Sequence, residues 1–362
     1  MCIRDSLGFE HVLPDHLNSA GTAVAGGVVA AEPANLTTTF YDATSAGTTE
    51  DATLGPKLKT VLSQTKYARL GTNIAVSVVD LSGANKFKPK YAGFNDEANF
   101  YAASTAKVCG MAAGYQFAAD VNNFLVSNSS IADMAELEKE LKGLWTKAGV
   151  AAGNHPLVSK VLAFSAGTPP TVKLRPEMIK VFDGLSEGNA NGTTAIVLLK
   201  FPFIGSTMLA QGLFSAATKS GLWLRYPYGG AAYMGKYYSI DPRGRGNPYP
   251  RTPIHCVSAV SMAQFFTLAA QGRLVDRASS KAMINHLDIT KGGCATNQVT
   301  LTTLRGKGLI AVKCGIWTGV VHVPLYYKDS TSSREFVIVI LTKNSKYRVL
   351  KGLFDELLAL VP

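Results

Sequence analysis

Ser104 and Lys107 are the residues of this sequence whose types and spacing best suit nucleophilic chemistry. A serine hydroxyl is a weak nucleophile until a neighbouring base removes its proton, and a lysine can be that base if burial or nearby positive charge lowers its pKa. Because residues three apart on a helix lie on one face, the run Ser104-Thr105-Ala106-Lys107 brings the hydroxyl and the amine together. The pair predicts a serine hydrolase or acyl-transferase that works through an acyl-enzyme, with Lys107 as general base.

A second run, Ser63-Gln64-Thr65-Lys66, has the same spacing, so its surroundings must separate it from the first. Ser104 and Lys107 follow aromatic residues and begin an apolar stretch, which predicts a desolvated lysine. Ser63 and Lys66 lie among polar residues, which predicts that both are solvated. We therefore expect the chemistry at Ser104.

The elements around Ser104 predict how it is held. Residues 74–80 alternate as a half-buried strand does, and residues 86–93 supply a second strand after a turn. The small and apolar residues 100–116 predict a buried helix that carries Ser104 and Lys107.

The middle of the chain predicts helices, and the end returns to strands. Residues 130–145 have helical periodicity with Ser130 and Asp133 as a capping pair, and Pro176 opens a helix that Gly184 ends. Strands are predicted at 308–313 and 336–342, and an amphipathic helix at 347–361. This order predicts an α/β (α+β) fold, with an antiparallel sheet built from both chain ends, flanking helices and an inserted all-helical lobe.

The domain organisation follows from the same pattern. We expect a disordered leader at 1–52, whose first residues look like a cloning or sequencing artefact and contain no signal peptide. One catalytic domain would span 53–362, with a sheet lobe at 53–100 and 300–362 and a helical lobe at about 101–299.

Composition excludes several functions. Lys and Arg total 36 against 25 Asp and Glu, a net charge of +11, yet no run of like charges and no motif indicates a nucleic-acid partner. The five cysteines lack CxxC spacing, so no metal or other cofactor is predicted, and a bridge between Cys256 and Cys294 is left open. No apolar stretch is long enough to span a bilayer.

Two other hydrolase patterns are also missing from the sequence. The histidines at 155, 255, 286 and 322 have no acidic partner at a recognised motif spacing, so no Ser-His-Asp triad is predicted. No Gly-x-Ser-x-Gly elbow occurs either, which argues against an α/β-hydrolase.

A second conspicuous lysine ends the run at 308–313 in Lys313-Cys314-Gly315, whereas Lys219-Ser220-Gly221 looks like a helix end closed by glycine. Together with Ser104, Lys107 and the order of elements, this tripeptide makes residues 53–362 resemble the class A β-lactamases and D-alanyl-D-alanine peptidases. The resemblance implies a sheet of both chain ends with a helical lobe, and a periplasmic or secreted location.

The resemblance also implies roles for the third motif. Lys313 would attract the substrate carboxylate, and the backbone N–H groups of Ser104 and Ile316 would form an oxyanion hole. Cys314 stands where the family has a hydroxyl residue, and Gly315 completes the substrate-binding strand. A thiol is a poorer hydrogen-bond donor than a hydroxyl, which weakens the expected carboxylate recognition.

The second motif of the family, Ser-x-Asn, matches best at Ser206-Thr207-Met208, where methionine replaces asparagine. Ser206 would pass a proton to the leaving group, or would instead be the N-cap of a helix that begins near Met208. Asp241 is a shorter stand-in for the deacylating glutamate of class A enzymes, or the start of a turn before Pro242.

These residues predict hydrolysis or transfer at an amide, ester or β-lactam carbonyl. The substrate would be a small molecule or peptide, as from a cell-wall polymer, with no nucleic acid and no membrane span. A class A-like β-lactamase is one alternative, and a non-catalytic or penicillin-binding member of the fold is the other. The oligomeric state does not follow from the sequence.

Overall fold

The computed structural model describes residues 41–42, 47–147, 150, 152–186, 192–215, 218, 220–224, 255–291, 304, 306–317, 319–343 and 347–361. The predicted leader therefore lies almost wholly outside the described residues, as do Asp241 and Cys294.

The largest sheet among these residues has six antiparallel strands, in the order β12-β14-β15-β3-β4 with β13 beside β14. Its strands are β3 (Ile74–Asp80), β4 (Lys90–Phe94), β12 (Gly308–Val312), β13 (Gly315–Trp317), β14 (Val320–Asp329) and β15 (Glu335–Lys343). The central strands β3 and β15 are rich in Val and Ile and almost fully buried, as strands covered on both faces are. The predicted sheet of both chain ends is confirmed.

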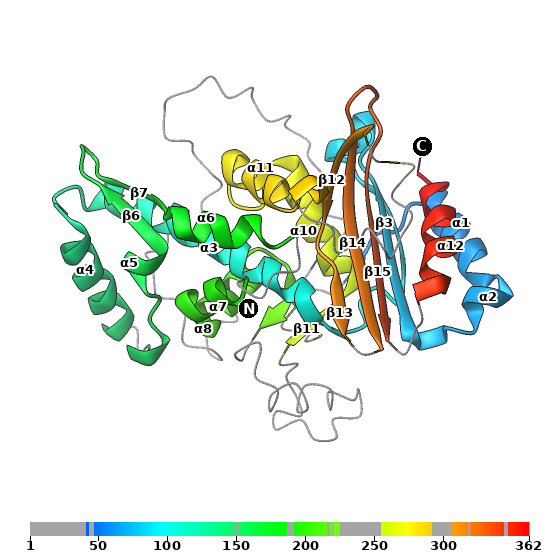
Figure 1. Ribbon diagram of the computed structural model, residues 1–362, viewed down its shortest axis with the longest axis horizontal. Helices are drawn as coiled ribbons and strands as arrows, with labels where there is room; N and C mark the ends of the chain where they lie inside the picture. Colours follow the sequence, from blue (N-terminus) through cyan, green and yellow to red (C-terminus); the bar gives the residue numbers. More distant parts are fainter. Residues whose placement is uncertain are drawn as a thin grey trace.

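Helices cover both faces of this sheet (Figure 1). On one face, α1, α2 and α12 pack on the strands through an apolar cluster that includes Leu58, Val76 and Phe354. On the other, α3 and α10 pack through a larger cluster that includes Val79, Val108 and Phe265. Because successive side chains of a strand point to opposite faces, β3, β4, β12, β14 and β15 each contribute to both clusters.

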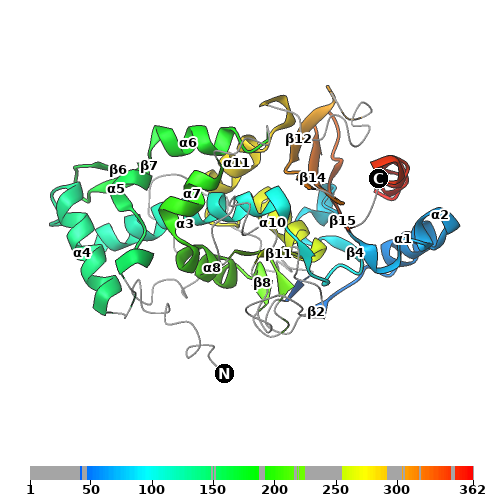
Figure 2. The ribbon, with the colours of Figure 1, turned by 60° about the horizontal axis from the view of Figure 1, so that its bottom comes forward.

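The helical lobe lies beyond the second face, with α4 and the β6–β7 hairpin at the end farthest from α12 (Figures 1 and 2). Among the described residues the helices are α1 (Leu54–Ser63), α2 (Thr65–Ala68), α3 (Lys107–Ser127), α4 (Met134–Lys147), α5 (Val158–Val161), α6 (Pro176–Asp183), α7 (Thr193–Leu199), α8 (Phe201–Ala210), α10 (Ala259–Gln271), α11 (Arg277–His286) and α12 (Tyr347–Leu358). Short 3-10 turns include η3 (Gly83–Phe87), η4 (Ala103–Ala106) and η5 (Ala152–Asn154).

Small sheets complete the fold. Their strands are β1 (Tyr41–Asp42) with β2 (Gly47–Thr48), β6 (Leu162–Ser165) with β7 (Thr171–Leu174), β8 (Phe214–Ser215) with β9 (Ser220–Gly221), and the set β10 (Trp223–Leu224), β11 (His255–Val257) and β5 (Phe100–Tyr101). The last set matters most here, because β5 leads directly into η4 and Ser104.

Several predicted elements are confirmed. β3 has the predicted bounds, although it is buried on both faces and not half-buried, because helices cover both sides of the sheet. α6 begins at Pro176 and is capped by Gly184, and strands and a terminal helix occur where the end of the chain predicts them. In each case a local signal, such as a proline at the first turn or a β-branched run, agrees with the burial that the fold imposes.

Other predictions were wrong at their boundaries. The helix expected from residue 100 begins only at Lys107, because β5 pairs with β11 and η4 intervenes. The second strand begins at Lys90, because η3 occupies the preceding residues. The cap of α4 is Asp133 and not Ser130, since the Asp133 carboxylate accepts a hydrogen bond from the Glu136 N–H (2.8 Å).

The Gly221 region was also misread as a helix end. Ser220 and Gly221 form β9, paired with β8, and Gly221 has a φ of +123°. A Cβ at this position would lie 2.4 Å from the carbonyl oxygen of Leu213, so glycine is needed for close strand approach. Within the described residues, no single helix is long and apolar enough to cross a membrane, and one pair bent by 97°, α7 with residues 203–210, meets that test only when combined.

Candidate active site

Ser104 lies in η4, at the point where β5 gives way to α3. The residue before it, Ala103, has a φ of +45°, in the left-handed region that side chains with a Cβ rarely adopt. Thr105 donates its backbone N–H to the carbonyl oxygen of Ala102 (3.1 Å) and so closes the turn around Ser104. Such strain costs roughly 1–3 kcal/mol and persists where surrounding contacts enforce it, as they do at active sites.

Lys107 is the first residue of α3, one turn after Ser104, and its side chain is buried with only 3% of the residue exposed. Burial, and secondly the positive charge of Lys313, lower the pKa of Lys107 to about 8. Desolvation disfavours the ammonium form, and a like charge nearby disfavours it further. The predicted desolvation of Lys107 is confirmed, and the amine is suited to accept a proton near neutral pH.

Lys313 directly follows β12 and is fully buried. Ile310, Val312 and Cys314 belong to the cluster on the α12 face, whereas Ala311 belongs to the cluster on the α3 face. By this alternation Lys313 extends toward α3, in agreement with its effect on Lys107. Its ammonium donates to the carbonyl oxygen of Cys314 (3.2 Å).

Cys314 follows Lys313 in sequence but lies in the apolar cluster on the other face of the sheet. Its side chain, 2% exposed, packs in the apolar cluster with α1 and α12. Since neighbouring residues of an extended chain point to opposite faces, a thiol beside Lys313 in sequence faces away from it in space.

Gly315 and Ile316 lie on β13, which packs against η4. A Cβ on Gly315 would lie 3.0 Å from the carbonyl oxygen of Ala102 and 3.0 Å from Cγ2 of Thr105. Glycine thus permits the strand to approach the turn that holds Ser104.

The direction of the Ile316 N–H follows from the strand register. β12 and β13 continue one ladder with β14, and the Lys313 N–H donates across it to the carbonyl oxygen of Pro324 (3.3 Å). Backbone N–H groups of an antiparallel strand alternate in direction, so the N–H of Ile316, three residues later, points to the opposite edge. That edge faces η4, as an oxyanion hole shared with Ser104 requires.

Ser206 is held by its own helix. Its hydroxyl donates to the carbonyl oxygen of Phe203 (2.8 Å). The interpretation of Ser206 as an N-cap was wrong, because α8 already begins at Phe201. Met208 is fully buried in the cluster on the α3 face.

A different segment packs on Lys107. A Cβ on Gly192, at the start of α7, would lie 2.8 Å from Cδ of Lys107 and 2.5 Å from Cδ2 of Leu185. The residue after Leu185, Ser186, is fully buried, and its hydroxyl has no hydrogen-bond partner among the described residues. The Ser-x-Asn spacing does not select Ser186, and the local signal for it is a serine two residues after Gly184, the C-cap of α6.

Two further expectations, on the histidines and on Cys256, are resolved by the structure. His286 does have an acidic partner, because its Nδ1 lies 2.8 Å from Oδ1 of Asp183 and its Nε2 lies 2.7 Å from the Tyr115 hydroxyl. The hydroxyl in this relay belongs to a tyrosine whose pKa burial raises, so it is not a nucleophile. Cys256 is buried and donates its thiol to the carbonyl oxygen of Gly221 (3.2 Å).

No protein-family model and no curated protein sequence matches the chain. Solved structures do: the β-lactamase of Sphaerobacter thermophilus has a TM-score of 0.50 and 15% identity, over 86% of this chain and 98% of that one. The chromosome-encoded β-lactamase of Vibrio parahaemolyticus has a TM-score of 0.49 and 9% identity over 85% and 97% of the two chains, and PBP-A has 0.48 and 13% over 85% and 95%. At such identities it is the architecture that is shared. The chain has a β-lactamase-like fold.

Proposed function

We propose that the protein is a serine hydrolase or acyl-transferase that forms an acyl-enzyme on Ser104. The observation that supports this most strongly is the buried Lys107, one turn after Ser104, with a pKa of about 8. At pH 7.4 a group with this pKa is neutral in about a fifth of molecules, against about 0.1% for an ordinary lysine. A resident base of this kind is what a serine nucleophile needs.

The proposed reaction uses the site as follows. Neutral Lys107 takes the proton of Ser104 as its oxygen attacks the substrate carbonyl, and the N–H groups of Ser104 and Ile316 stabilise the resulting oxyanion by several kcal/mol. The tetrahedral intermediate then expels the leaving group, which receives the proton from Lys107. Water attack on the ester releases the acid and restores Ser104.

Lys313 would hold an anionic group of the substrate. It is buried, and its charge already acts on Lys107, so a bound carboxylate would offset two cations in a low-dielectric site. Ser186, rather than Ser206, is our candidate for carrying a proton to the leaving group, because it is buried in the segment that packs near Lys107.

The fate of the acyl-enzyme separates the alternatives. A class A-like β-lactamase needs a carboxylate that activates the deacylating water. The sequence provides only Asp241, shorter than that glutamate, as a candidate, and Gly192 packs on the Lys107 side chain where the family's amide would be expected. We therefore propose slow deacylation, closer to a peptidase or penicillin-binding protein than to a β-lactamase.

The test is covalent labelling. The protein is incubated with a fluorescent penicillin and, separately, with an activated ester, and intact mass, the modified peptide and product release are followed. We expect an adduct on Ser104 that is absent in Ser104→Ala and present in Ser63→Ala, the matched serine of the other Ser-x-x-Lys run. No adduct and no turnover with either reagent would favour a non-catalytic protein, and rapid penicillin turnover would favour a β-lactamase.

A further inference from the structure

His322 on β14 is fully buried and engaged at both ring nitrogens. Its Nδ1 lies 3.2 Å from the backbone nitrogen of Thr342, and its Nε2 lies 2.6 Å from the carbonyl oxygen of Tyr101. A backbone N–H can only donate, so Nδ1 is the acceptor and Nε2 carries the proton that it donates to Tyr101. Burial lowers the pKa of His322 to about 4, so this neutral form is the one present near neutral pH.

The imidazole is anchored in the rigid part of the sheet. Val321 and Thr342 are paired in the β14–β15 register, but the Thr342 hydroxyl donates to the Val321 carbonyl (2.7 Å) and accepts from the Val321 N–H (3.2 Å). Both backbone groups of Val321 therefore bond to the Thr342 hydroxyl and not to the Thr342 backbone. The backbone N–H of Thr342 is instead directed to the ring of His322, which fixes the ring from the side of β15.

The other end of the imidazole contacts β5, the strand that precedes Ser104. Tyr101 is the last residue of β5, two residues before the strained Ala103 and three before Ser104. The ring also lies under β13, since a Cβ on Gly315 would be 3.1 Å from Cδ2 of His322. His322 therefore contacts Tyr101, which leads into η4, and Gly315 of β13, so it connects the two segments that carry the proposed oxyanion N–H groups.

We propose that His322 is a positioning residue that sets the spacing between η4 and β13 and thereby aligns the N–H groups of Ser104 and Ile316. The hydrogen bond to Tyr101 holds the backbone that leads to the strained Ala103 and to Ser104. The imidazole ring also packs against β13 at Gly315. The catalytic consequence of this proposal rests on the proposed acyl-enzyme, whereas its structural consequence does not.

The test uses two amides of different reach. Gln in His322→Gln places its NH₂ near the position of Nε2 and keeps the donor to Tyr101, whereas Asn in His322→Asn reaches only to the position of Nδ1. His155→Asn is the matched control, because His155 is also buried and bonded through Nε2, to the carbonyl oxygen of Val150 (2.9 Å), in the helical lobe.

Two readouts are measured on full-length protein. Amide hydrogen exchange of peptides covering 100–106 and 315–317 should rise at least about 10-fold in His322→Asn, and should stay near wild type in His322→Gln and His155→Asn. The rate constant of Ser104 acylation at saturating activated ester should fall about 100-fold in His322→Asn, while the half-saturating concentration changes less than about 3-fold. His322→Gln should recover most of that rate.

The outcomes separate the two proposals. If wild type takes no label, the acyl-enzyme proposal fails, and the exchange measurement still decides whether His322 holds η4 and β13. If exchange and acylation in His322→Asn match those of His155→Asn, the positioning role is overturned. Equal loss in His322→Gln and His322→Asn would also contradict it, because the donor to Tyr101 would then be irrelevant.

Discussion

The chain contains two Ser-x-x-Lys runs that the fold treats in opposite ways. At Ser63, the hydroxyl donates to the Thr60 carbonyl (2.9 Å), and Lys66, half exposed, forms an ion pair with Glu356 that raises its pKa. Lys107 is buried beside another cation, and its pKa falls to about 8. The same spacing therefore yields a solvated surface pair in one place and, in the other, a serine followed by a buried lysine with a lowered pKa, and burial makes the difference.

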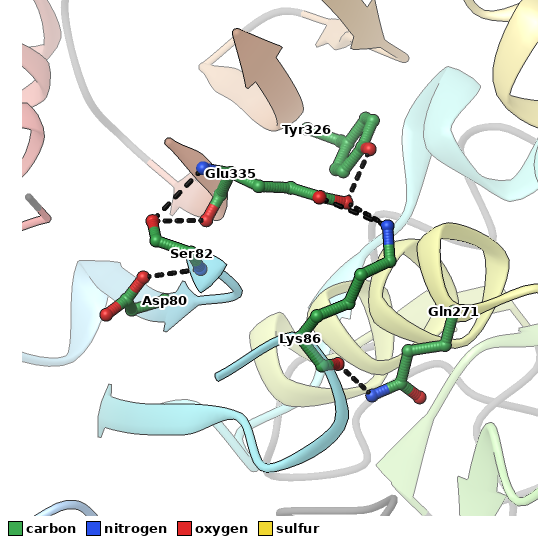
Figure 3. Close-up of polar contacts among 6 residues, drawn as sticks. All are labelled: Asp80, Ser82, Lys86, Gln271, Tyr326 and Glu335. Carbon is green, nitrogen blue, oxygen red and sulfur yellow. Dashed lines mark hydrogen bonds and ion pairs between the residues drawn. The ribbon is translucent and has the colours of Figure 1, made fainter. Parts of the chain in front are cut away.

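A third lysine, Lys86, pairs with an opposite charge. The Lys86 ammonium points at the buried carboxylate of Glu335 (2.9 Å), which also accepts from the Tyr326 hydroxyl (2.7 Å), as Figure 3 shows. The backbone carbonyl of Lys86 accepts from Gln271 (2.7 Å), which ties η3 to α10. Lys86 faces an opposite charge, as a structural ion pair does, whereas the charge that perturbs Lys107 has its own sign.

The largest expected effect is a difference in acylation rate between variants of Lys107 and Lys66. Lys107→Met removes the proposed base and should slow acylation of Ser104 about 1000-fold, whereas Lys66→Met should change it less than about 2-fold. Rates are measured with an activated ester by stopped-flow or time-resolved mass spectrometry. Comparable rates in the two variants would remove Lys107 from the chemistry.

Lys107→Met and Lys66→Met should also differ in the pH dependence of their thermal stability. The unfolded chain holds the Lys107 proton up to the ordinary lysine pKa of 10.5, and the folded chain releases it near 8, so the penalty of burying the charge is complete below pH 8 and disappears as the pH rises toward 10.5. Lys107→Met should therefore raise the Tm at pH 7 and lose this advantage at high pH. Lys66→Met should lower the Tm slightly at both.

A smaller effect should follow from the packing of β13 on η4. Gly315→Ala places a methyl group against the Ala102 carbonyl and should move Ile316 away from Ser104, slowing acylation about 30-fold. Gly143→Ala in α4 is the control, because a Cβ there meets no atom within 4 Å and alanine favours a helix. An unchanged acylation rate in Gly315→Ala would argue against an oxyanion role for Ile316.

The pH dependence tests the influence of one buried lysine on the other. Acylation should rise with pH through a midpoint near 8, as Lys107 becomes neutral. Lys313→Met removes the charge that helps to lower this pKa, so the midpoint should move to higher pH, by about one unit or less because burial is the larger cause. A midpoint that moves down, measured with a neutral ester over a range of about pH 6 to 10, would contradict the assignment.

The smallest effect on activity should come from the structural ion pair. Glu335→Gln leaves a hydrogen-bond acceptor for Tyr326 but removes the charge opposite Lys86, and should destabilise the fold by about 2 kcal/mol. Acylation at a temperature where the variant is folded should stay within about 2-fold of wild type. A large loss of activity there would mean that the pair of Lys86 and Glu335 contributes to acylation and is not only structural.

Much of this architecture is determined by local sequence signals. The apolar run of β3, the proline and glycine that bound α6, and the β-branched run that ends at Lys313 each specify an element from residues close in the chain. The Ser104 and Lys107 pair was visible in the same way, because its spacing and its apolar context are both local.

Only the tertiary structure decided which residues meet around that pair. Cys314 packs in the apolar cluster with α1 and α12, Gly192 packs on the Lys107 side chain, and His286 contacts Asp183, which is 103 residues away in the chain. His322 donates a hydrogen bond to the carbonyl oxygen of Tyr101, which is 221 residues away in the chain. The sequence determined the helices, the strands and the candidate pair Ser104 and Lys107, since these depend on neighbouring residues, but contacts between distant strands depend on register and packing that no local pattern encodes.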